Sequence, residues 1–336
     1  MDFAKKLLAK LNINQSPSII GIVDDERCDL HVQEANHQES PERTKAIRSY
    51  LKASGLYNVL KKIPAKKLES NDPILEAVHS KEHIQTIIDA CTKHARKNLG
   101  PDMTVNGIPS LTSALVAAGS VVAAVDAITD PSSGVKRVFC NVRSPGHHAS
   151  STKSTGFCIY NNIAVAAKHA LTKPNIKRVL IFDPDLHAGD GTSQIFWAEK
   201  NVLWCSFHRG TDFYPYTGSK SEKGQYNNIM NFPFPSNVTA AEYIKQFDTE
   251  FIPRAREFKP DMIFISCGFD SHKDDLYHAL PLDYEHFEYM TKELVKLADD
   301  CSEGRIVSAL EGGYTPDVIA KCADVHIRAL FPIKNN

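Results

Sequence analysis

Six short apolar runs recur along the chain, and their residues are hydrophobic in succession rather than in alternation. The runs occupy residues 18–25, 135–146, 177–187, 201–210, 261–270 and 305–314. Continuous apolarity is typical of strands that are covered on both faces, as in a parallel sheet. Segments of helical character that are rich in alanine and valine, such as 110–130 and 157–173, lie between the runs. The pattern predicts an α/β fold built from βαβ units.

No linker rich in Pro, Gly or Ser and no internal repeat interrupts this pattern. We therefore expect residues 1–336 to form a single domain, with three α/β/α layers around a central, mostly parallel sheet. The chain is 42% hydrophobic and 24% charged, which suits a large buried core and excludes the disordered and collagen-like classes.

Charge, cysteine usage and the N-terminal segment indicate the partners and the cellular compartment expected for such a chain. Its 39 basic and 40 acidic residues give a formal net charge of −1, which offers nothing to nucleic acid or anionic lipid. The eight cysteines contain no CxxC pair, so we expect buried free thiols in a reducing compartment. Residues 1–18 resemble a small amphipathic helix rather than a signal peptide, and no segment approaches the ~20 apolar residues of a membrane span. The expected location is the cytoplasm, with the nucleus left open.

The last five apolar runs share a further feature, because each ends in glycine, polar or ionisable residues. These ends are Gly146 to His148, Asp185 to Asp190, His208 to Gly210, Asp270 to His272 and Gly312 to Tyr314. Ligands of open parallel sheets bind outside the carboxyl ends of the strands. We therefore expect the five loops to converge on one site.

Two of these loops carry the elements of a metal site. Asp185 and His187 are separated by one residue, so in an extended segment their side chains point to the same side. With Asp270 from another strand end, they offer two oxygens and one nitrogen that can hold Zn²⁺ and leave a position for water. Such an open site suits the hydrolysis of an amide. An isolated DxH pair would more often be a surface turn.

The adjacent pair His147 and His148 faces unclaimed carboxylates at Asp183 and Asp190. If each imidazole donates a ring N–H to a carboxylate, its tautomer is set and the other ring nitrogen is free to face a water molecule. Two such dyads would supply a general base and an acid for the leaving amine. The alternative is a pair of ordinary core or surface histidines.

Aromatic residues in the neighbouring loops complete the candidate site. Tyr314 follows two glycines and could donate its hydroxyl to a developing oxyanion, although GGY alone is usually a turn. Phe157, Phe213 and Tyr214 would most often be core residues, yet they lie beside the same strand ends. They could wall a narrow tube that fits an aliphatic chain ending in an amide.

With these motifs in place, the sequence resembles the histone deacetylase superfamily, which includes acetoin-utilisation proteins and acetylpolyamine amidohydrolases. The motifs ANHQESPERTKAI, LGPDMTV, NVRSPGHHAS, GFCIYNNIAVAA, DPDLHAGDGT, FYPYTG, GFDSHKDD and LEGGY occur in the family's order. The resemblance covers nearly the whole chain and implies an arginase/deacetylase-like fold. Two of these motifs, GFDSH and LEGGY, resemble the class II and bacterial branches more than class I.

The resemblance implies roles position by position. The implied zinc ligands are Asp185, His187 and Asp270, and the implied catalytic residues are His147, His148, Asp183, Asp190 and Tyr314. The implied walls and rim of an acyl-lysine tunnel are Gly156, Phe157, Tyr214, Tyr277 and, more loosely, Asp102. Asp183 and Ser206 match side-chain ligands of a structural monovalent cation, usually potassium, and Arg43 matches an arginine near an inner acetate exit.

Departures from the family pattern are informative. Ala188 stands where many members have a second histidine, and we expect altered packing rather than lost catalysis. DDLYHAL replaces the familiar DPLG and places Tyr277 at the gatekeeping position, where polyamine-selective relatives carry a glutamate.

We expect a zinc-dependent deacylase that removes acetyl or longer acyl groups from the ε-amine of lysine in proteins or peptides. An amidohydrolase of small acylated amines such as acetylpolyamines is an alternative, for which Asp274 and Asp275 could form an acidic rim. An arginase-like hydrolase would need a further carboxylate where this chain has His272. A silent module that binds acylated tails is the alternative outside the enzymes. Neither nucleic acid nor membrane is an expected partner, and acyl-chain length and oligomeric state stay open.

Overall fold

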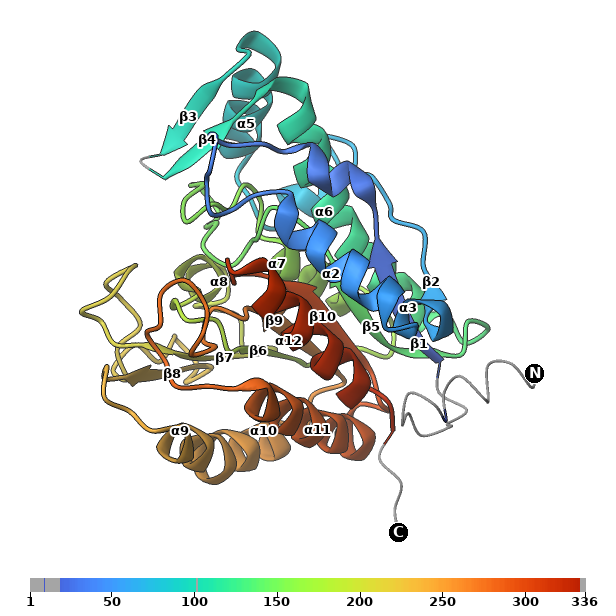
Figure 1. Cartoon of the computed structure of the whole chain (residues 1–336), viewed down its shortest axis with the longest axis vertical. Coiled ribbons are helices and arrows are strands. Elements are labelled where there is room, and N and C mark those ends of the chain that lie inside the picture. The colour runs from blue at the N-terminus through green and yellow to red at the C-terminus, as the bar shows by residue number, and fades with distance from the viewer. Residues whose placement is uncertain (1–8, 10–18, 101, 333–336) are drawn as a thin grey trace.

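The centre of the computed structural model is one eight-stranded sheet (Figure 1), and the structure describes residues 9, 19–100 and 102–332. The strand order is β2-β1-β5-β10-β9-β6-β7-β8, and every neighbouring pair is parallel. The strands of this sheet are β1 Ile19–Asp24, β2 Lys61–Lys62, β5 Val135–Asn141, β6 Val179–Asp183, β7 Val202–Arg209, β8 Ile229–Phe234, β9 Met262–Cys267 and β10 Ile306–Leu310. Each of the six predicted runs contains one of these strands.

The sheet's two edge strands, β2 and β8, are absent from the prediction. β2 has only two residues, too few to give a pattern. β8 carries Pro233, which sequence rules associate with edges because proline has no N–H to donate to a further strand. A separate antiparallel hairpin is formed by β3 Lys97–Gly100 and β4 Met103–Val105.

Helices cover both faces of the sheet and form the predicted α/β/α layers (Figure 1). One layer holds α6 Gly107–Thr129 and α7 Asn162–Leu171, with η1 Glu26–Leu30, α4 Pro73–Glu76, α5 Lys81–Lys93 and α8 Asp190–Ile195 around them. The other layer holds α2 Glu42–Ala53, α3 Leu56–Val59, α9 Ala240–Gln246, the π-helical turn η2 Phe247–Phe251, α10 Ile252–Phe258, α11 Tyr284–Cys301 and α12 Pro316–Ala329.

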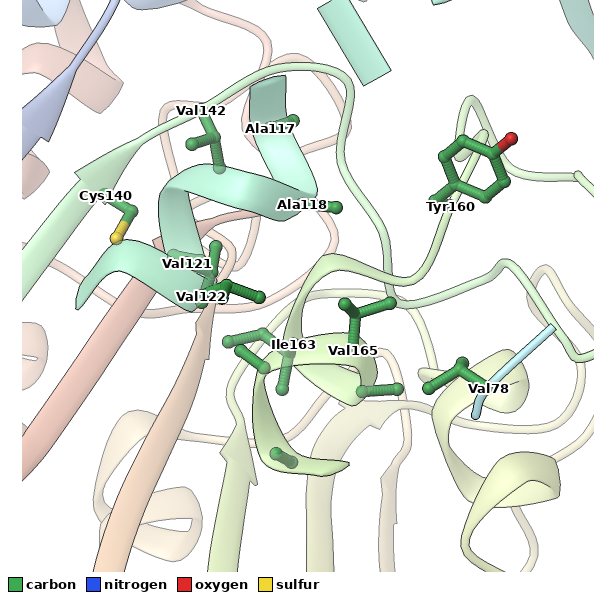
Figure 2. Close-up of a cluster of buried hydrophobic side chains, with 14 of the residues drawn as sticks. Val78, Ala117, Ala118, Val121, Val122, Cys140, Val142, Tyr160, Ile163 and Val165 are labelled. Carbon is green, nitrogen blue, oxygen red and sulfur yellow. The ribbon is translucent and has the colours of Figure 1, made fainter. Parts of the chain in front are cut away.

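Alternate strand residues feed two separate hydrophobic cores. In β5, Val138 and Cys140 join the core beneath α6 and α7, whereas Phe139 joins the core beneath α2, α11 and α12. Figure 2 shows part of the first core, where Val121 and Val122 of α6 and Ile163 of α7 lie near one another. Both faces are therefore buried, which explains the continuous apolarity of the strands.

Helix α6 corrects one expectation, because by length and composition alone it could cross a membrane. The structure encloses it instead, and 78% of its most apolar 18-residue window is buried. The segment after β2 crosses its outer side, where a Cβ on Gly119 would lie 2.1 Å from the Lys66 carbonyl oxygen. Leu68 N also donates to the Leu115 carbonyl at 3.2 Å. The apolar surface all around α6 is thus that of a core helix.

The expectations for the cysteines and for two further helices have different outcomes. All eight cysteines are free, and seven are buried, as predicted. The helix expected over 157–173 begins only at Asn162, because the Asn161 side chain caps it by accepting the N–H of Ala164 at 3.0 Å. The preceding residues are left as a loop at the carboxyl edge of the sheet. The helix expected within 1–18 lies outside the described residues apart from residue 9.

Candidate metal centre and tunnel

The carboxyl ends of four neighbouring strands, β5, β10, β9 and β6, deliver the candidate residues to one place. Asp183 ends β6, and Asp185 and His187 follow it. Asp270 comes three residues after β9, and Tyr314 four residues after β10. The structure therefore brings these side chains together because their strands are adjacent and parallel.

Asp185, His187 and Asp270 form a buried cluster whose potential ligand atoms all lie within 4.8 Å of one another. The backbone places both carboxylates, since Gly312 N donates to Asp185 Oδ2 at 2.8 Å and Leu186 N donates to Asp270 Oδ1 at 2.9 Å. A Cβ on Gly312 would lie 2.3 Å from Asp270 Oδ2, so only glycine permits this approach.

One carboxylate oxygen of this cluster has no hydrogen bond. Asp270 Oδ2 is buried and accepts none from any described residue, although His187 Nδ1 lies 3.1 Å away. The same nitrogen is 3.2 Å from Asp185 Oδ1. Two carboxylates that converge on one imidazole, with an oxygen left over, fit a divalent cation that takes oxygen and nitrogen ligands.

Electrostatics in the absence of a cation support this fit. Burial and the charge of Asp185 raise the pKa of Asp270 to about 6. Burial alone would lower the pKa of His187, but the carboxylates of Asp185 and Asp270 raise it to about 9. Both shifts reflect buried negative charge of the kind that a bound metal ion would compensate.

The first His–Asp dyad consists of His147 and Asp183. His147 Nδ1 is 3.1 Å from Asp183 Oδ2, and its Nε2 is 3.7 Å from Asp185 Oδ1. Burial opposes the charged imidazole, but the charges of Asp185 and Asp183 outweigh it and raise the pKa of His147 well above its usual value. These two carboxylates therefore favour the charged form of His147.

The second dyad has the opposite electrostatics. His148 Nδ1 is 2.7 Å from Asp190 Oδ1, and the two histidine rings are 4.1 Å apart between centroids. Burial and the neighbouring charge of His147 lower the pKa of His148 to about 4. Two imidazoles whose pKa values are driven apart can divide the roles of acid and base.

Tyr314 is placed by contacts on both its backbone and its ring. Its N–H donates to Asp275 Oδ2 at 2.8 Å, and the guanidinium of Arg43 lies 5.1 Å from the ring centroid. Burial raises the pKa of Tyr314 well above its usual value, so the hydroxyl stays a proton donor. Asp275 is itself fully buried, which contradicts its expected place in an acidic rim.

A tunnel of about 240 Å³ ends on these groups. Its walls are Asp102, His148, Gly156, Phe157, His187, Phe213, Tyr214, Tyr277 and Tyr314. All five residues that the resemblance places along the tunnel line it, and so does Phe213, which the sequence offered as a possible wall residue. The Tyr277 hydroxyl accepts a hydrogen bond from Gln38 Nε2 at 2.5 Å, a contact that no motif indicated.

Asp102 joins two parts of the tunnel wall rather than facing solvent freely. Its Oδ2 accepts the Gly156 N–H at 3.0 Å and the Tyr214 hydroxyl at 3.0 Å. Phe157 has a φ of 63°, a left-handed conformation that is uncommon outside glycine and turns its ring towards Tyr314.

Two further predicted positions lie around the metal cluster. Asp183 and Ser206 are paired across β6 and β7, and the Ser206 hydroxyl is 2.8 Å from His208 Nδ1. On the inner side of Tyr314, Arg43 Nε donates to the Gly313 carbonyl at 2.5 Å and another of its nitrogens donates to the Glu311 carbonyl.

Glu311 is the residue that sequence reasoning missed. It is fully buried, and its Oε2 accepts the N–H groups of Gly146 at 2.6 Å and His147 at 3.0 Å. Burial raises its pKa to about 7. An acid at the end of an apolar strand, inside LEGGY, was the available signal. Its contact with the tandem histidines is visible only in the fold.

Comparisons with known proteins show which proteins the chain is similar to. A family model described as the histone deacetylase domain matches residues 37–330. Over 319 residues the chain is 36% identical to histone deacetylase 6 of Caenorhabditis elegans, covering 89% of this chain and 32% of that protein. Over 338 residues it is 34% identical to histone deacetylase 5 of Arabidopsis thaliana, covering 94% of this chain and 49% of that protein.

Among solved structures, the HDA15 HD domain superposes with a TM-score of 0.86 at 32% identity, covering 94% of this chain and 89% of that one. The arginase/deacetylase-like fold expected from the sequence is therefore confirmed. The chain spans only a third of the first curated relative named above and about half of the second.

Proposed function

The chain belongs to the histone deacetylase family, and from that premise we propose that it is a zinc-dependent hydrolase of acyl-lysine in proteins or peptides. The observation that carries the proposal is the buried group of Asp185, His187 and Asp270 at the end of an aromatic tunnel. A narrow apolar tube suits the methylene stem of lysine, and convergent polar groups at its end suit the amide.

Asp185, His187 and Asp270 would hold the zinc ion. When bound, zinc polarises the amide carbonyl and lowers the pKa of water. The Tyr314 hydroxyl, which stays protonated, donates to the carbonyl oxygen as negative charge develops there.

The two histidines have different roles in the proposed reaction. His148 is neutral, its Nδ1 is held by Asp190, and its Nε2 is left to accept the proton of the water that attacks the amide carbon. The same proton can pass to the leaving lysine nitrogen, which cannot depart as an anion. The charge of Asp183 favours a proton on His147, which would place a positive charge near the developing oxyanion.

A monovalent cation, with potassium the first candidate, is proposed at Asp183 and Ser206, where a carboxylate and a hydroxyl lie on neighbouring strand ends. Arg43 is proposed to attract the acetate product on the inner side of Tyr314, since its buried guanidinium lies 5.1 Å from the centroid of that ring. Both proposals follow the family resemblance and the placement of these side chains.

Two observations favour acyl-lysine over the alternatives. The carboxylate that lines the tunnel, Asp102, is engaged with Gly156 and Tyr214, and Asp275 is buried and accepts the backbone N–H of Tyr314. A cationic polyamine would thus find little free negative charge there. His272 is paired with Asp283 at 3.4 Å and packs on Tyr284, so it offers no second metal position of the arginase type.

The deciding experiment measures hydrolysis by the zinc-loaded protein of acetyl-lysine peptides, longer acyl-lysine peptides and acetylated polyamines, with the His148→Ala variant as the blank. We expect turnover of peptides that the substitution removes. Turnover of polyamines alone would replace the proposal with a small-molecule amidohydrolase. Silence on every substrate with zinc bound would indicate a binding module.

A further inference from the structure

A second hollow lies beside the tunnel and has no role in the chemistry above. It is a groove of about 910 Å³, several times the volume of the tunnel. The first two turns of α5, the end of β3, residues 150–155 and helix α8 line it. The groove is bounded on the tunnel side by Tyr214 and Pro215.

The groove and the tunnel share one wall. His148 and Tyr214 line both hollows, and their rings meet edge to face with centroids 5.1 Å apart. The Thr155 hydroxyl extends this wall, because it lies 3.0 Å from the Tyr214 hydroxyl. A molecule whose acylated side chain fills the tunnel therefore has the rest of its structure at the entrance to the groove.

The groove differs from the tunnel in chemistry. Its lining contains six serine and threonine residues and two carboxylates, and it holds Lys153 and Gln194. The side chains of Glu82, Lys153 and Gln194 make no hydrogen bond or ion pair with any described residue. The unpartnered carboxylate, ammonium and amide of these three side chains can bind the backbone N–H and C=O groups and the polar side chains of an extended peptide.

We propose that this groove receives the polypeptide chain on one side of the acyl-lysine, so that the residues flanking the lysine contribute to substrate selection. The proposal rests on the proposed deacylase function and commits the site to a peptide or protein substrate. A small acylated amine has no polypeptide chain beside its acyl group and would leave most of the groove empty.

Two exposed side chains test the groove without touching the chemistry. Gln194→Trp places a bulky ring in the groove, and Lys153→Glu reverses the charge of its basic group. Lys200→Glu makes the same charge change on the exposed surface away from the groove and serves as the matched control. Thermal melts and metal content establish that each variant is folded and loaded.

The substrates are a doubly capped acetyl-lysine without flanking residues and two peptides that carry either acidic or basic residues on both sides of the acetyl-lysine. For Gln194→Trp we expect the ratio of kcat/KM for peptide over the capped amino acid to fall about tenfold, mainly through KM. For Lys153→Glu we expect the preference for the acidic over the basic peptide to fall roughly 3- to 10-fold, as for exchanging one exposed attractive pair for a repulsive one. Lys200→Glu should leave both ratios within about twofold.

Unchanged ratios in both groove variants would overturn the groove assignment while leaving the deacylase proposal intact. If the wild-type protein hydrolyses neither the peptides nor the capped amino acid, the deacylase proposal fails instead. The groove is then judged by fluorescence anisotropy with the same two acetyl peptides. Equal affinities for the wild-type protein and both variants in that assay would overturn it.

Discussion

We call the side of the central sheet where its strands begin the amino edge, and the side where they end the carboxyl edge. Both carry charged residues of similar kinds, but the two environments differ. At the amino edge, Asp261 Oδ2 accepts the N–H groups of Lys177 and Arg178 at 2.8 Å in an exposed setting. The nearby Glu303 pairs with Arg305 at 2.8 Å while its own side chain is 71% exposed. At this edge, water shares the stabilisation of the charges, and each pair is worth little.

At the carboxyl edge the charges are buried together. Asp183, Asp185, Asp270 and Glu311 are each 0% exposed. Burial of like charges disfavours folding unless partners or a cation compensate it, so such a cluster is expected where function requires it. The comparison teaches that the environment of the charges, rather than their number, distinguishes a site from an ordinary surface.

The largest effect should come from His187→Ala at the carboxyl edge. The variant loses the nitrogen between the two carboxylates, so we expect it to lose bound metal and roughly 10³-fold or more in turnover. Metal analysis by mass spectrometry and a peptide hydrolysis assay measure the two losses. Full activity with no bound metal would refute the metal assignment and remove the contrast between the edges.

A smaller effect is expected from Tyr314→Phe, which removes a hydroxyl and leaves the packing against Arg43 and Phe157 in place. We expect turnover to fall by about 10²-fold or more, as for the loss of one oxyanion donor. The melting temperature and the metal content should stay near those of the unaltered protein. Turnover that does not change would take the tyrosine out of the mechanism.

Glu311, also at the carboxyl edge, tests whether a buried charge there can matter only by positioning another residue. Glu311→Ala leaves the N–H groups of Gly146 and His147 without their acceptor, so we expect a loss of about 1 to 3 kcal/mol of stability. Displacement of His147 should also lower kcat about tenfold with little change in KM. Glu311→Gln keeps a carbonyl oxygen as acceptor and should recover most of both losses. Equal behaviour of the two variants would indicate that the hydrogen bonds do not position the histidine.

The pH dependence of stability separates the carboxyl edge from a surface in another way. Burial lowers the pKa of His208 from 6.5 to about 4. The unfolded chain therefore takes up a proton near pH 6.5 that the folded chain refuses until about pH 4, so stability falls as pH drops through this window. One such histidine contributes a slope of about 1.4 kcal/mol per pH unit.

Urea unfolding of His208→Gln at pH 7 and pH 5 tests this contribution. We expect the variant to lose less stability between the two values than the unaltered protein does. His94→Gln, which changes an exposed histidine at the end of α5, is the control. The same pH response in all three proteins would show that burial of His208 has no such effect.

The smallest effect is predicted for Asp261→Asn at the amino edge. Asparagine keeps one oxygen to accept the backbone N–H groups, so we expect a loss of at most about 1 kcal/mol of stability. Turnover should equal that of the unaltered protein. A large loss of turnover from this change would mean that the two edges are coupled and that the comparison is too simple.

Much of the fold could be predicted because the controlling interactions are local or periodic. Continuous apolar runs identify six of the eight strands of the main sheet, and the polar residues at their ends locate the site. The exceptions have physical causes. β2 is too short to give a pattern, β8 is an edge strand, and α6 is apolar all around because the segment through Lys66 covers its outer side.

The predicted site was less complete because its contacts join distant segments. Asp275 was expected near the rim but lies buried beneath Tyr314, since the turn after Asp270 folds back towards β10. Glu311 and the groove beside Tyr214 depend on loops that meet only in the tertiary structure. No spacing within one segment reports such contacts.

What the sequence determined by itself is the set of chemical groups, their attachment to strand ends and, through parallel order, their arrival at one edge. What only the tertiary structure decided is how each group behaves there. His147 and His148 are neighbours in sequence, each with an aspartate partner, yet the pKa of the first is raised and that of the second is lowered. The reason is that a pKa depends on burial and on the distances to charges from other segments, and those distances exist only once the strands have come together.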